Sequence, residues 1–410
     1  MKNEINNFLY KSIGFANYNH KLSKNLINDG YKLINQSQES LKFLRNSYNT
    51  EYLKIMFSNA NKNGIKKFAK ELNHKITITL KYLEVNVNRI ELFMFFNKFE
   101  KNQTCLYSID YSIENQNLNK ISDLTHSLKF HETEISFNSV SMKLIDFITN
   151  EILYNKCFTK NNENLEQFSG SKFKNYLIID FNEKIDGIDD LLFELGTTSK
   201  IGTIKENGLY APSSSYKNKT LENIISCFNN YKCLSLLDSF TVIGENNYDK
   251  ENIYSKKIWD DIYFSIYIFN LYVKCSVQIL SNHFSANPMK KRKEFQNFYN
   301  KYYLKKISFN FLPNEIYKGI RKSMEIEDDI DFINQRLETA AIQINEKQQR
   351  QQEMLLLAIS VIALLETPLH IDGIRQIIGI NQIEIYNIAT YSSLVFLVSL
   401  FLILKLGKKY

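Results

Sequence analysis

The sequence predicts an α/β/α cytosolic domain followed by a long stalk helix and two transmembrane helices. Three observations lead to this fold class. From Ile76 onward, short segments alternate between polar residues and β-branched or aromatic residues, which is the period of strands. From Ile326 to Ile344, aliphatic residues recur every three or four positions, which is the period of a helix with one apolar seam. Near the C-terminus, the stretch from Ile388 to Leu404 contains no charged residue, as a transmembrane helix requires.

Length and composition restrict the class of protein. A chain of 410 residues is long enough for two or three domains, and its low content of proline (4) and glycine (13) argues against disorder and loop-rich scaffolds. The net charge of +7 permits an anionic partner without requiring one. The five cysteines lack metal-binding or redox spacing, so we expect reduced thiols. The N-terminus has no uninterrupted apolar stretch and therefore predicts no cleavable signal.

Residues 1–312 are predicted to form the α/β domain. The apolar positions of residues 5–73 fit helices, whereas the alternating segments beyond Ile76 fit strands. Helices on both sides of a sheet would satisfy this order of elements. Further strands are expected at 176–181 and 240–243, and further helices at 139–154 and 253–284.

The second predicted membrane span, 388–405, is followed by a basic tail, 406–410. Its charge-free stretch of 17 residues would measure ~26 Å as a helix, which is just enough for the hydrocarbon core of a bilayer. Lysines follow this span and basic residues precede the first one, so both termini are expected in the cytoplasm and the spans in the plasma (inner) membrane. The alternative is a buried C-terminal helix of a soluble domain.

The first predicted span, 354–381, begins with an apolar run from Met354 to Leu365 that only Ser360 interrupts. As a helix continued to Ile380, it would measure ~40 Å and could cross a bilayer with tilt. Ionisable residues at membrane depth are tolerated against a water-filled cavity or another protein chain. The span is therefore expected to line a pore, because it carries Glu366, His370, Asp372 and Arg375.

One face of the first span is expected to line this pore. At ~100° per residue, six positions spaced by three or four residues fall into one narrow sector of the helix. The sector combines polar and aliphatic side chains, as a gated conduit would. Its members are Ala363, Thr367, His370, Ile374, Ile377 and Asn381.

Residues 313–353 are predicted to form the stalk helix, continuous with the first span from about Asn314 to Ile380. A heptad seam on this helix would be covered by partner helices in an oligomer. An ordinary amphipathic core helix would explain the seam equally well. The seam consists of Ile326, Ile330, Ile333, Leu337, Ala340 and Ile344.

Gly379, Ile380 and Asn381 stand between the two predicted spans. With this tripeptide, the last hundred residues resemble the CorA family of two-transmembrane divalent-cation transporters and channels, whose signature is Gly-Met-Asn, with variants that carry Gly-Ile-Asn. Pro368 within the first span and Glu384 after it match positions where CorA-like proteins often carry these residues. Over the rest of the chain the likeness is one of architecture only.

The resemblance implies a homopentamer in which the first spans line the pore and the second spans lie outside. Asn381 would ring the external mouth, and Glu384, in the external loop 382–387, would concentrate cations there. Some divergent CorA-like proteins are effectors of type III CRISPR systems, and a nucleotide second messenger that joins S-adenosylmethionine to AMP opens them.

We favour such an antiviral signalling effector for three reasons: the isoleucine in the signature, the ionisable residues of the first span, and the large cytosolic part. The alternative is a transporter of Mg²⁺ or another divalent cation. Mg²⁺ is the only cofactor that the resemblance suggests.

Three other motifs have open interpretations. The loop 196–203 (GTTSKIGT) resembles a phosphate-binding loop but lacks the Walker spacing, so an ordinary loop is expected. The basic stretch 289–293 and the aromatic residues after it would bind a nucleotide or anionic lipid headgroups, or form a solvated helix face. The acidic run 325–331 corresponds to regulatory metal sites of the family, or to a solvated helix surface. We expect no enzyme, because no catalytic triad, HExxH motif or carboxylate pair emerges, and no nucleic-acid polymer as partner.

Overall fold

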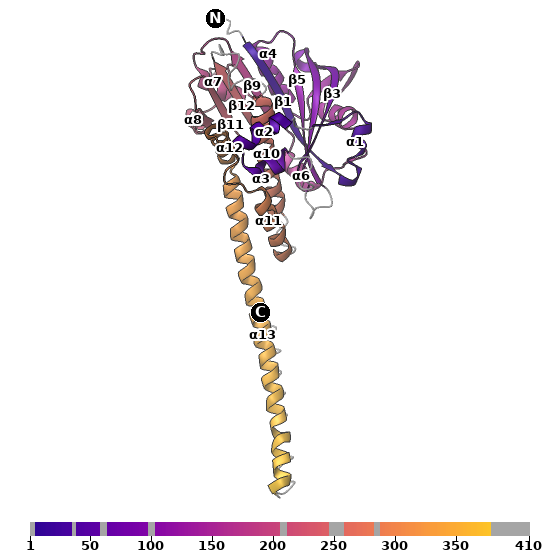
Figure 1. Cartoon of the computed structure of the whole chain (residues 1–410), viewed down its shortest axis with the longest axis vertical. Helices are drawn as coiled ribbons and strands as arrows, with labels where there is room; N and C mark the ends of the chain where they lie inside the picture. The colour runs from indigo at the N-terminus through magenta and orange to yellow at the C-terminus, as the bar shows by residue number, and fades with distance from the viewer. Residues whose placement is uncertain are drawn as a thin grey trace. The chain divides into compact units, whose positions relative to one another are not determined.

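The fold is described from a computed structural model of the chain (Figure 1). The described residues are 5–34, 38–57, 64–96, 103–205, 211–245, 258–282 and 288–378. The chain consists of two compact units, Met1–Ile333 and Asn334–Tyr410.

A large, mostly antiparallel sheet forms the centre of the first unit. Its described strands follow the order β10-β11-β12-β9-β1-β5-β4-β3-β6-β7, with β2 paired to β3 and β8 paired to β1. Each of these pairs is antiparallel except β9 with β12, which are parallel. The strands are β1 (Ile5–Tyr18), β2 (Lys32–Leu33), β3 (Lys66–Ile78), β4 (Leu83–Met94), β5 (Gln103–Ser112), β6 (Glu134–Phe137), β7 (Val140–Lys143), β8 (Phe158–Thr159), β9 (Lys174–Phe181), β10 (Ile224–Ile225), β11 (Tyr231–Ser235) and β12 (Ser239–Glu245).

Helices pack on both faces of the sheet (Figure 1). α4 (Leu118–Leu128), α5 (Leu144–Phe147) and α7 (Ile188–Gly196) contribute to one large hydrophobic core together with sheet residues such as Leu177. α10 (Phe264–Asn282) lies on the opposite face, where the ring of Phe264 is 4.8 Å from that of Tyr176 and 5.8 Å from that of Phe93. Tyr176 and Leu177 are consecutive in β9, so their side chains point to opposite faces. The mixed α/β class predicted from the sequence is therefore confirmed.

The helices differ widely in length. They are α1 (Asn25–Asn28), α2 (Gln38–Ser47), α3 (Thr50–Met56), α4 (Leu118–Leu128), α5 (Leu144–Phe147), α6 (Glu163–Ser169), α7 (Ile188–Gly196), α8 (Ser214–Leu221), α10 (Phe264–Asn282), α11 (Pro288–Tyr302), α12 (Phe311–Ser323) and α13 (Ile326–Ile378). Shorter helical turns are η1 (His20–Leu22), η2 (Thr79–Lys81), η3 (Ile148–Ile152) and η4 (Trp259–Tyr263).

Most strands predicted by alternation are confirmed. The segments beyond Ile76 correspond to the end of β3 and to β4, β5 and β6, and the two later segments correspond to β9 and β12. In β4 the buried positions change from odd to even numbers, from Val85 and Val87 to Ile90 and Leu92. The pairing register with β5 shifts between Val87 and Arg89, so an extra residue reverses the alternation without turning the strand out of the core.

The helical prediction for residues 5–73 is correct for α2 and α3 but wrong for β1 and for the start of β3. β1 lies between β5 and β9, and its residues from Phe8 to Tyr18 are all buried. A strand covered on both faces lacks the polar alternation that identifies a half-exposed strand. The predicted helix at 139–154 is also only partly correct, because its first residues form β7.

Residues 259–282, which form η4 and α10, are the central helix of this unit. Among the described residues, it is the one helix long and apolar enough to cross a membrane. However, 78% of its most apolar 18-residue stretch is buried inside the fold. Core helices of soluble domains share these properties, and the ring contacts of Phe264 with the sheet identify this helix as one of them.

The helix predicted as a single piece over 314–380 is broken at Glu325. This residue adopts a left-handed backbone conformation, with φ of 52°, and α13 begins at the next residue. Arg321 and Lys322 lie in the last turn of α12, and three acidic residues lie in the first turn of α13. Basic residues at a helix end and acidic residues at a helix start are favoured by the helix dipole, so the local charges stabilise two helices rather than one.

Candidate functional site

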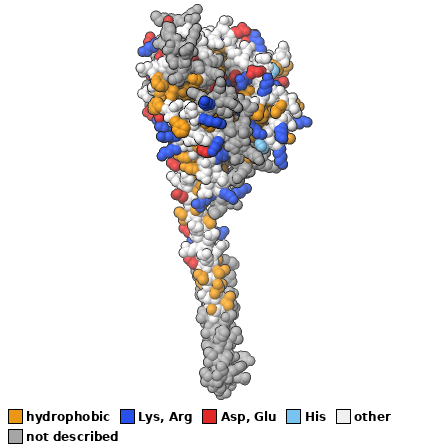
Figure 2. All heavy atoms as spheres, in the orientation of Figure 1, with side chains coloured by type: hydrophobic (Ala, Val, Ile, Leu, Met, Phe, Trp, Pro, Cys, Tyr) orange, Lys and Arg blue, Asp and Glu red, His pale blue; other side chains and the backbone are white. Residues whose placement is uncertain are grey.

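The second unit contains a helical segment with exposed apolar side chains (Figure 2). The segment, here called the apolar segment, covers residues 354–362 of α13. Its exposed large side chains are Met354 (51%), Leu355 (62%), Leu356 (62%), Leu357 (45%), Ile359 (53%) and Ile362 (54%).

The apolar segment is apolar on every side. Successive helix residues are ~100° apart, so the four consecutive residues 354–357 cover the whole circumference. The hydroxyl of Ser360 donates to the carbonyl oxygen of Leu356 at 2.8 Å, so this polar group is satisfied without water. A helix that is hydrophobic all round belongs in a protein core or a membrane. Burial of the six exposed side chains would contribute on the order of 10 kcal/mol.

The backbone of α13 carries most of the predicted pore stripe. Ala363 is exposed, and the helix continues to Ile378, so positions spaced by three and four residues share one face. The stripe residues within the helix are Ala363, Thr367, His370, Ile374 and Ile377. Gly379, Ile380, Asn381 and Glu384 lie outside the described residues, as do the external loop 382–387, the second span 388–405 and the tail 406–410.

The heptad seam is divided between two environments. Ile326, Ile330 and Ile333 are at most 4% exposed in the single chain, so this half of the seam belongs to the core of the first unit. Ala340 and Ile344 are only half-buried. In an oligomer, partner helices would cover only the later seam positions, and the core-helix interpretation holds for the earlier ones.

The acidic run at the start of α13 makes ion pairs within its own chain. Glu327 Oε1 lies 2.7 Å from Arg321 Nε, and Asp329 Oδ2 lies 2.7 Å from the buried Nζ of Lys274 on α10. Among the described residues, no group of three or more His, Cys, Asp or Glu side chains is arranged to hold a metal ion. These contacts favour the attachment of α13 to α10 over a metal site.

The basic and aromatic stretch predicted near 289–303 forms α11. Phe295, Phe298 and Tyr302 are buried, and the ring of Tyr302 lies 5.0 Å from that of Tyr272 on α10. The basic residues Arg292 and Lys293 are exposed. The aromatic residues therefore belong to the core, which favours the solvated helix face over a ligand site.

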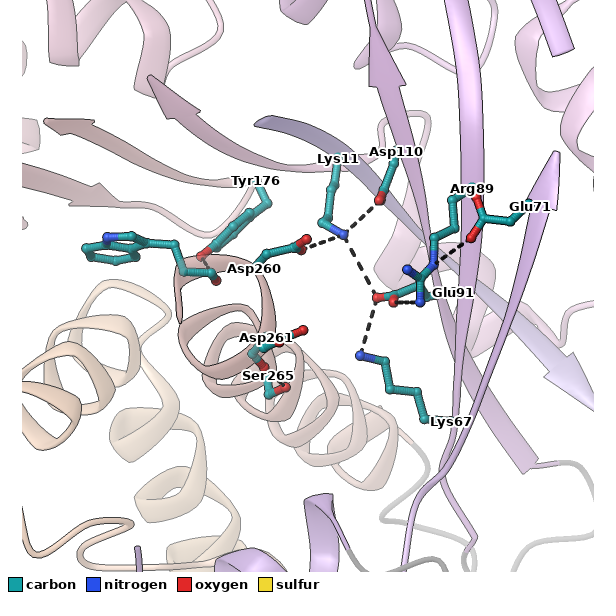
Figure 3. A network of polar contacts seen from close by, with 11 residues as sticks. Lys11, Lys67, Glu71, Arg89, Glu91, Asp110, Tyr176, Asp260, Asp261 and Ser265 are labelled. Atoms are coloured by element: carbon teal, nitrogen blue, oxygen red, sulfur yellow. Dashed lines mark hydrogen bonds and ion pairs between the residues drawn. The ribbon is translucent and has the colours of Figure 1, made fainter. Parts of the chain in front are cut away.

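A buried charge network connects the sheet to η4 (Figure 3). Lys11 on β1 lies opposite Asp110 on β5 in the strand register. Its Nζ is 2.8 Å from Asp110 Oδ1, 2.8 Å from Asp260 Oδ1 of η4 and 3.9 Å from Glu91 Oε2 of β4. The same ammonium group lies 4.8 Å from the centre of the Phe264 ring. The side chain of Lys11 is 1% exposed, so protein groups replace its hydration.

Glu91 extends this network across the sheet. Its carboxylate lies 3.5 Å from Lys67 Nζ and 2.9 Å from Arg89 Nη2, and Arg89 Nε lies 3.8 Å from Glu71. Burial would raise the pKa of Glu91, but Lys67, Lys11 and Arg89 outweigh burial and hold its pKa below the usual range.

The pKa values of Lys11 and Asp110 show how burial and neighbouring charges act on these two groups. Burial would lower the pKa of Lys11, but Asp110, Glu91 and Asp260 raise it well above its usual value, so the ammonium stays charged. Burial raises the pKa of Asp110 to about 6 against the opposing effect of Lys11, and the charges of Glu91 and Asp260 add to this rise. Every charge faces an opposite charge of the network, so these groups fix η4 on the sheet rather than await a ligand.

Sequence reasoning missed this network. Its members come from β1, β3, β4, β5 and η4, and no short motif contains them. One signal was present: Lys11 interrupts an otherwise apolar segment, and a buried lysine needs carboxylate partners.

No family model, curated protein or solved structure matched the chain. The resemblance to CorA-like proteins therefore rests on the residues of the C-terminal part alone.

Proposed function

We propose that the chain is a membrane protein in which α13 enters the bilayer at Met354 and residues 388–405 form a second span. The observation that carries this proposal is the apolar segment, whose side chains cover the whole helix circumference and are exposed in the single chain. A lipid bilayer provides the apolar environment that such a helix requires.

The membrane part forms a homo-oligomeric pore, and the resemblance to CorA suggests a pentamer. The ionisable residues at 366, 370, 372 and 375 follow directly on the apolar segment. In a bilayer they need a water-filled lumen or a neighbouring chain, and a ring of first spans supplies both. The half-buried seam residues Ala340 and Ile344 provide a further contact between stalk helices.

The first unit controls the pore through α13. The start of this helix is held by the burial of Ile330 and by the ion pair of Asp329 with Lys274. A ligand that favours one arrangement of the unit would thus bias the helix that lines the pore. We propose a nucleotide second messenger of the S-adenosylmethionine–AMP class as this ligand, in antiviral defence. The alternative, supported by the Gly379-Ile380-Asn381 signature, is a constitutive transporter of Mg²⁺ or another divalent cation.

Ion flux into liposomes tests the pore and separates the two functions. The purified full chain is incorporated into liposomes that contain fluorescent indicators for Mg²⁺ and K⁺, with and without the messenger. Flux that requires the messenger supports the effector, and Mg²⁺ flux without it supports the transporter. Absence of flux under both conditions, with incorporation verified, would contradict the pore.

The pore stripe predicts the effect of Ile374→Ser. A hydroxyl in an aliphatic constriction eases wetting, so this variant should conduct without an activating signal. Val398→Ser, an equivalent change in the predicted second span, serves as the matched control and should behave as wild type. The measurement is the rate of ion flux at equal protein incorporation. Equal rates for both variants and wild type would show that Ile374 does not line the pore.

A further inference from the structure

Basic side chains gather beside the loop 197–205. This loop follows α7 and turns back onto α4. The carbonyl oxygen of Thr198 accepts a hydrogen bond from Lys129 Nζ at 2.9 Å and lies 2.9 Å from His126 Nδ1. The loop is the GTTSKIGT stretch that resembles a phosphate-binding loop in sequence.

Lys129 and Lys172 converge on one aromatic ring. Their Nζ atoms lie 4.9 and 5.7 Å from the centre of Phe130, which is half-buried. The pKa of Lys129 falls to about 8, because of burial and then because of the neighbouring charge of Lys172, with Asp238 acting in the opposite direction. The two ammonium groups are therefore close enough to repel each other.

Two more lysines, Lys81 and Lys200, act on the imidazole of His126. The pKa of His126 is lowered mainly by burial and further by Lys129, Lys200 and Lys81, against the opposing hydrogen bond to Thr198. Lys81 at the end of η2, Lys129 directly after α4 and Lys200 in the loop thus act on the imidazole of His126, and Lys129 and Lys172, which lies two residues before β9, lie over the ring of Phe130.

Carboxylates neutralise only part of this cluster. Lys81 pairs with Asp123 at 2.9 Å, and Asp238 is an ion-pair partner of Lys174. No carboxylate in the described part of the chain lies within ion-pair distance of Lys129, Lys172 or Lys200. Like charges brought together without counterions raise the free energy of the fold, and a bound anion would relieve this repulsion.

We propose that Lys129, Lys172 and Lys200, together with the loop 197–205, form a binding site for the phosphate groups of a small ligand such as a nucleotide. Lysine ammonium groups bind phosphate through strong charge-assisted hydrogen bonds. The contrast with Lys11 is informative, because that lysine is enclosed by carboxylates whereas these three lack them.

This site deepens the proposed gating by locating the phosphate contacts in the first unit, and it rests on that function only for its effect on the pore. Binding is measured without ion flux, so the two can fail separately. A chain that conducts ions but binds no phosphate would overturn this site alone.

Binding is tested with the full chain in mild detergent by isothermal titration calorimetry. The probes are inorganic pyrophosphate, AMP and adenosine. The site variant is Lys172→Gln with Lys200→Gln, because both side chains are exposed, and its folding is checked by the unfolding midpoint. Lys305→Gln with Lys306→Gln changes the same net charge at two other exposed lysines and is the matched control. A third variant, Lys129→Gln, removes the hydrogen bond to the loop.

Wild type should bind pyrophosphate and AMP saturably and adenosine not at all. The site variant should bind at least about tenfold more weakly, and the control variant within about twofold of wild type. AMP binding tighter than that of pyrophosphate would identify a nucleotide as the source of the phosphate, and the reverse would identify an inorganic polyphosphate. Equal losses in the site and control variants would overturn the proposal, because diffuse charge would then explain binding. No saturable binding of any probe would overturn it as well.

Discussion

Lys11 shows how one buried charge constrains the fold. Replacement by methionine keeps most of the side-chain volume but leaves the carboxylates of Asp110, Asp260 and Glu91 without their shared cation. Removal of one partner from a buried ion pair costs about 3–5 kcal/mol, so Lys11→Met should lower the free energy of unfolding by this amount.

Intrinsic fluorescence during urea unfolding measures this effect. The only tryptophan of the chain, Trp259, is 2% exposed and precedes Asp260 of the network. Lys75→Met is the control, because Lys75 pairs with Glu84 at the surface and its side chain is 53% exposed. The control should leave the unfolding midpoint unchanged. Equal midpoints for Lys11→Met and wild type would show that the network does not hold η4 in place.

Asp110 makes the free energy of unfolding depend on pH. Its pKa is raised to about 6, mainly by burial, so between pH 4 and 6 the folded state binds a proton that the unfolded state has released. The contribution of this group to stability therefore decreases as the pH rises through this window. The lowered pKa of Glu91 acts in the opposite direction at more acidic pH.

Asp110→Asn isolates this contribution. The stability of wild type relative to the variant should decrease from pH 4 to pH 7, because only wild type releases the proton. Urea unfolding of both proteins at a series of pH values measures the difference. A difference that is constant or increases with pH would show that Asp110 does not titrate in this window.

At the scale of elements, the start of α13 behaves as part of the core. Ile330 is 4% exposed whereas Ile342, further along the same helix, is 59% exposed. Ile330→Ala should cost about 2–4 kcal/mol of unfolding free energy, because it leaves a cavity. Ile342→Ala should change it by less than about 0.5 kcal/mol in detergent. Similarly small effects at both positions would show that Ile330 does not pack in the core, and would favour an oligomer interface for the early seam positions.

The elements also show where sequence patterns are informative. Strands such as β4 keep a recognisable alternation, and the buried strand β9 contains a continuous apolar run from Tyr176 to Ile179. The sequence pattern does not identify β1 as a strand, because both of its faces are covered and its buried residues show no polar alternation. The break at Glu325 was missed because neither a proline nor a glycine marks it, although the charges on either side mark a helix end and a helix start.

At the scale of the whole molecule, the sequence alone indicates the exposed apolar segment but not the charge clusters. Hydropathy and periodicity are local, so they are sufficient to find the apolar segment, and the stripe from Ala363 to Ile377 stays a prediction. The network of Lys11 and the cluster of Lys129 depend on strand order. Lys11 of β1 meets Asp260 of η4, and Lys129 meets Thr198, which is 69 positions further along the chain, so no local pattern contains that information.

We propose that the apolar segment lies in a bilayer, and quenching of tryptophan fluorescence by brominated lipids tests this location most directly. The native Trp259 is buried in the first unit, so wild type in liposomes supplies an unquenched reference. Leu356→Trp places a second indole in the apolar segment, and Ile342→Trp places one at an exposed position of the same helix outside it. Brominated lipids should quench the added fluorescence of Leu356→Trp, and aqueous iodide should quench that of Ile342→Trp. Quenching of Leu356→Trp by iodide but not by brominated lipids would contradict the claim.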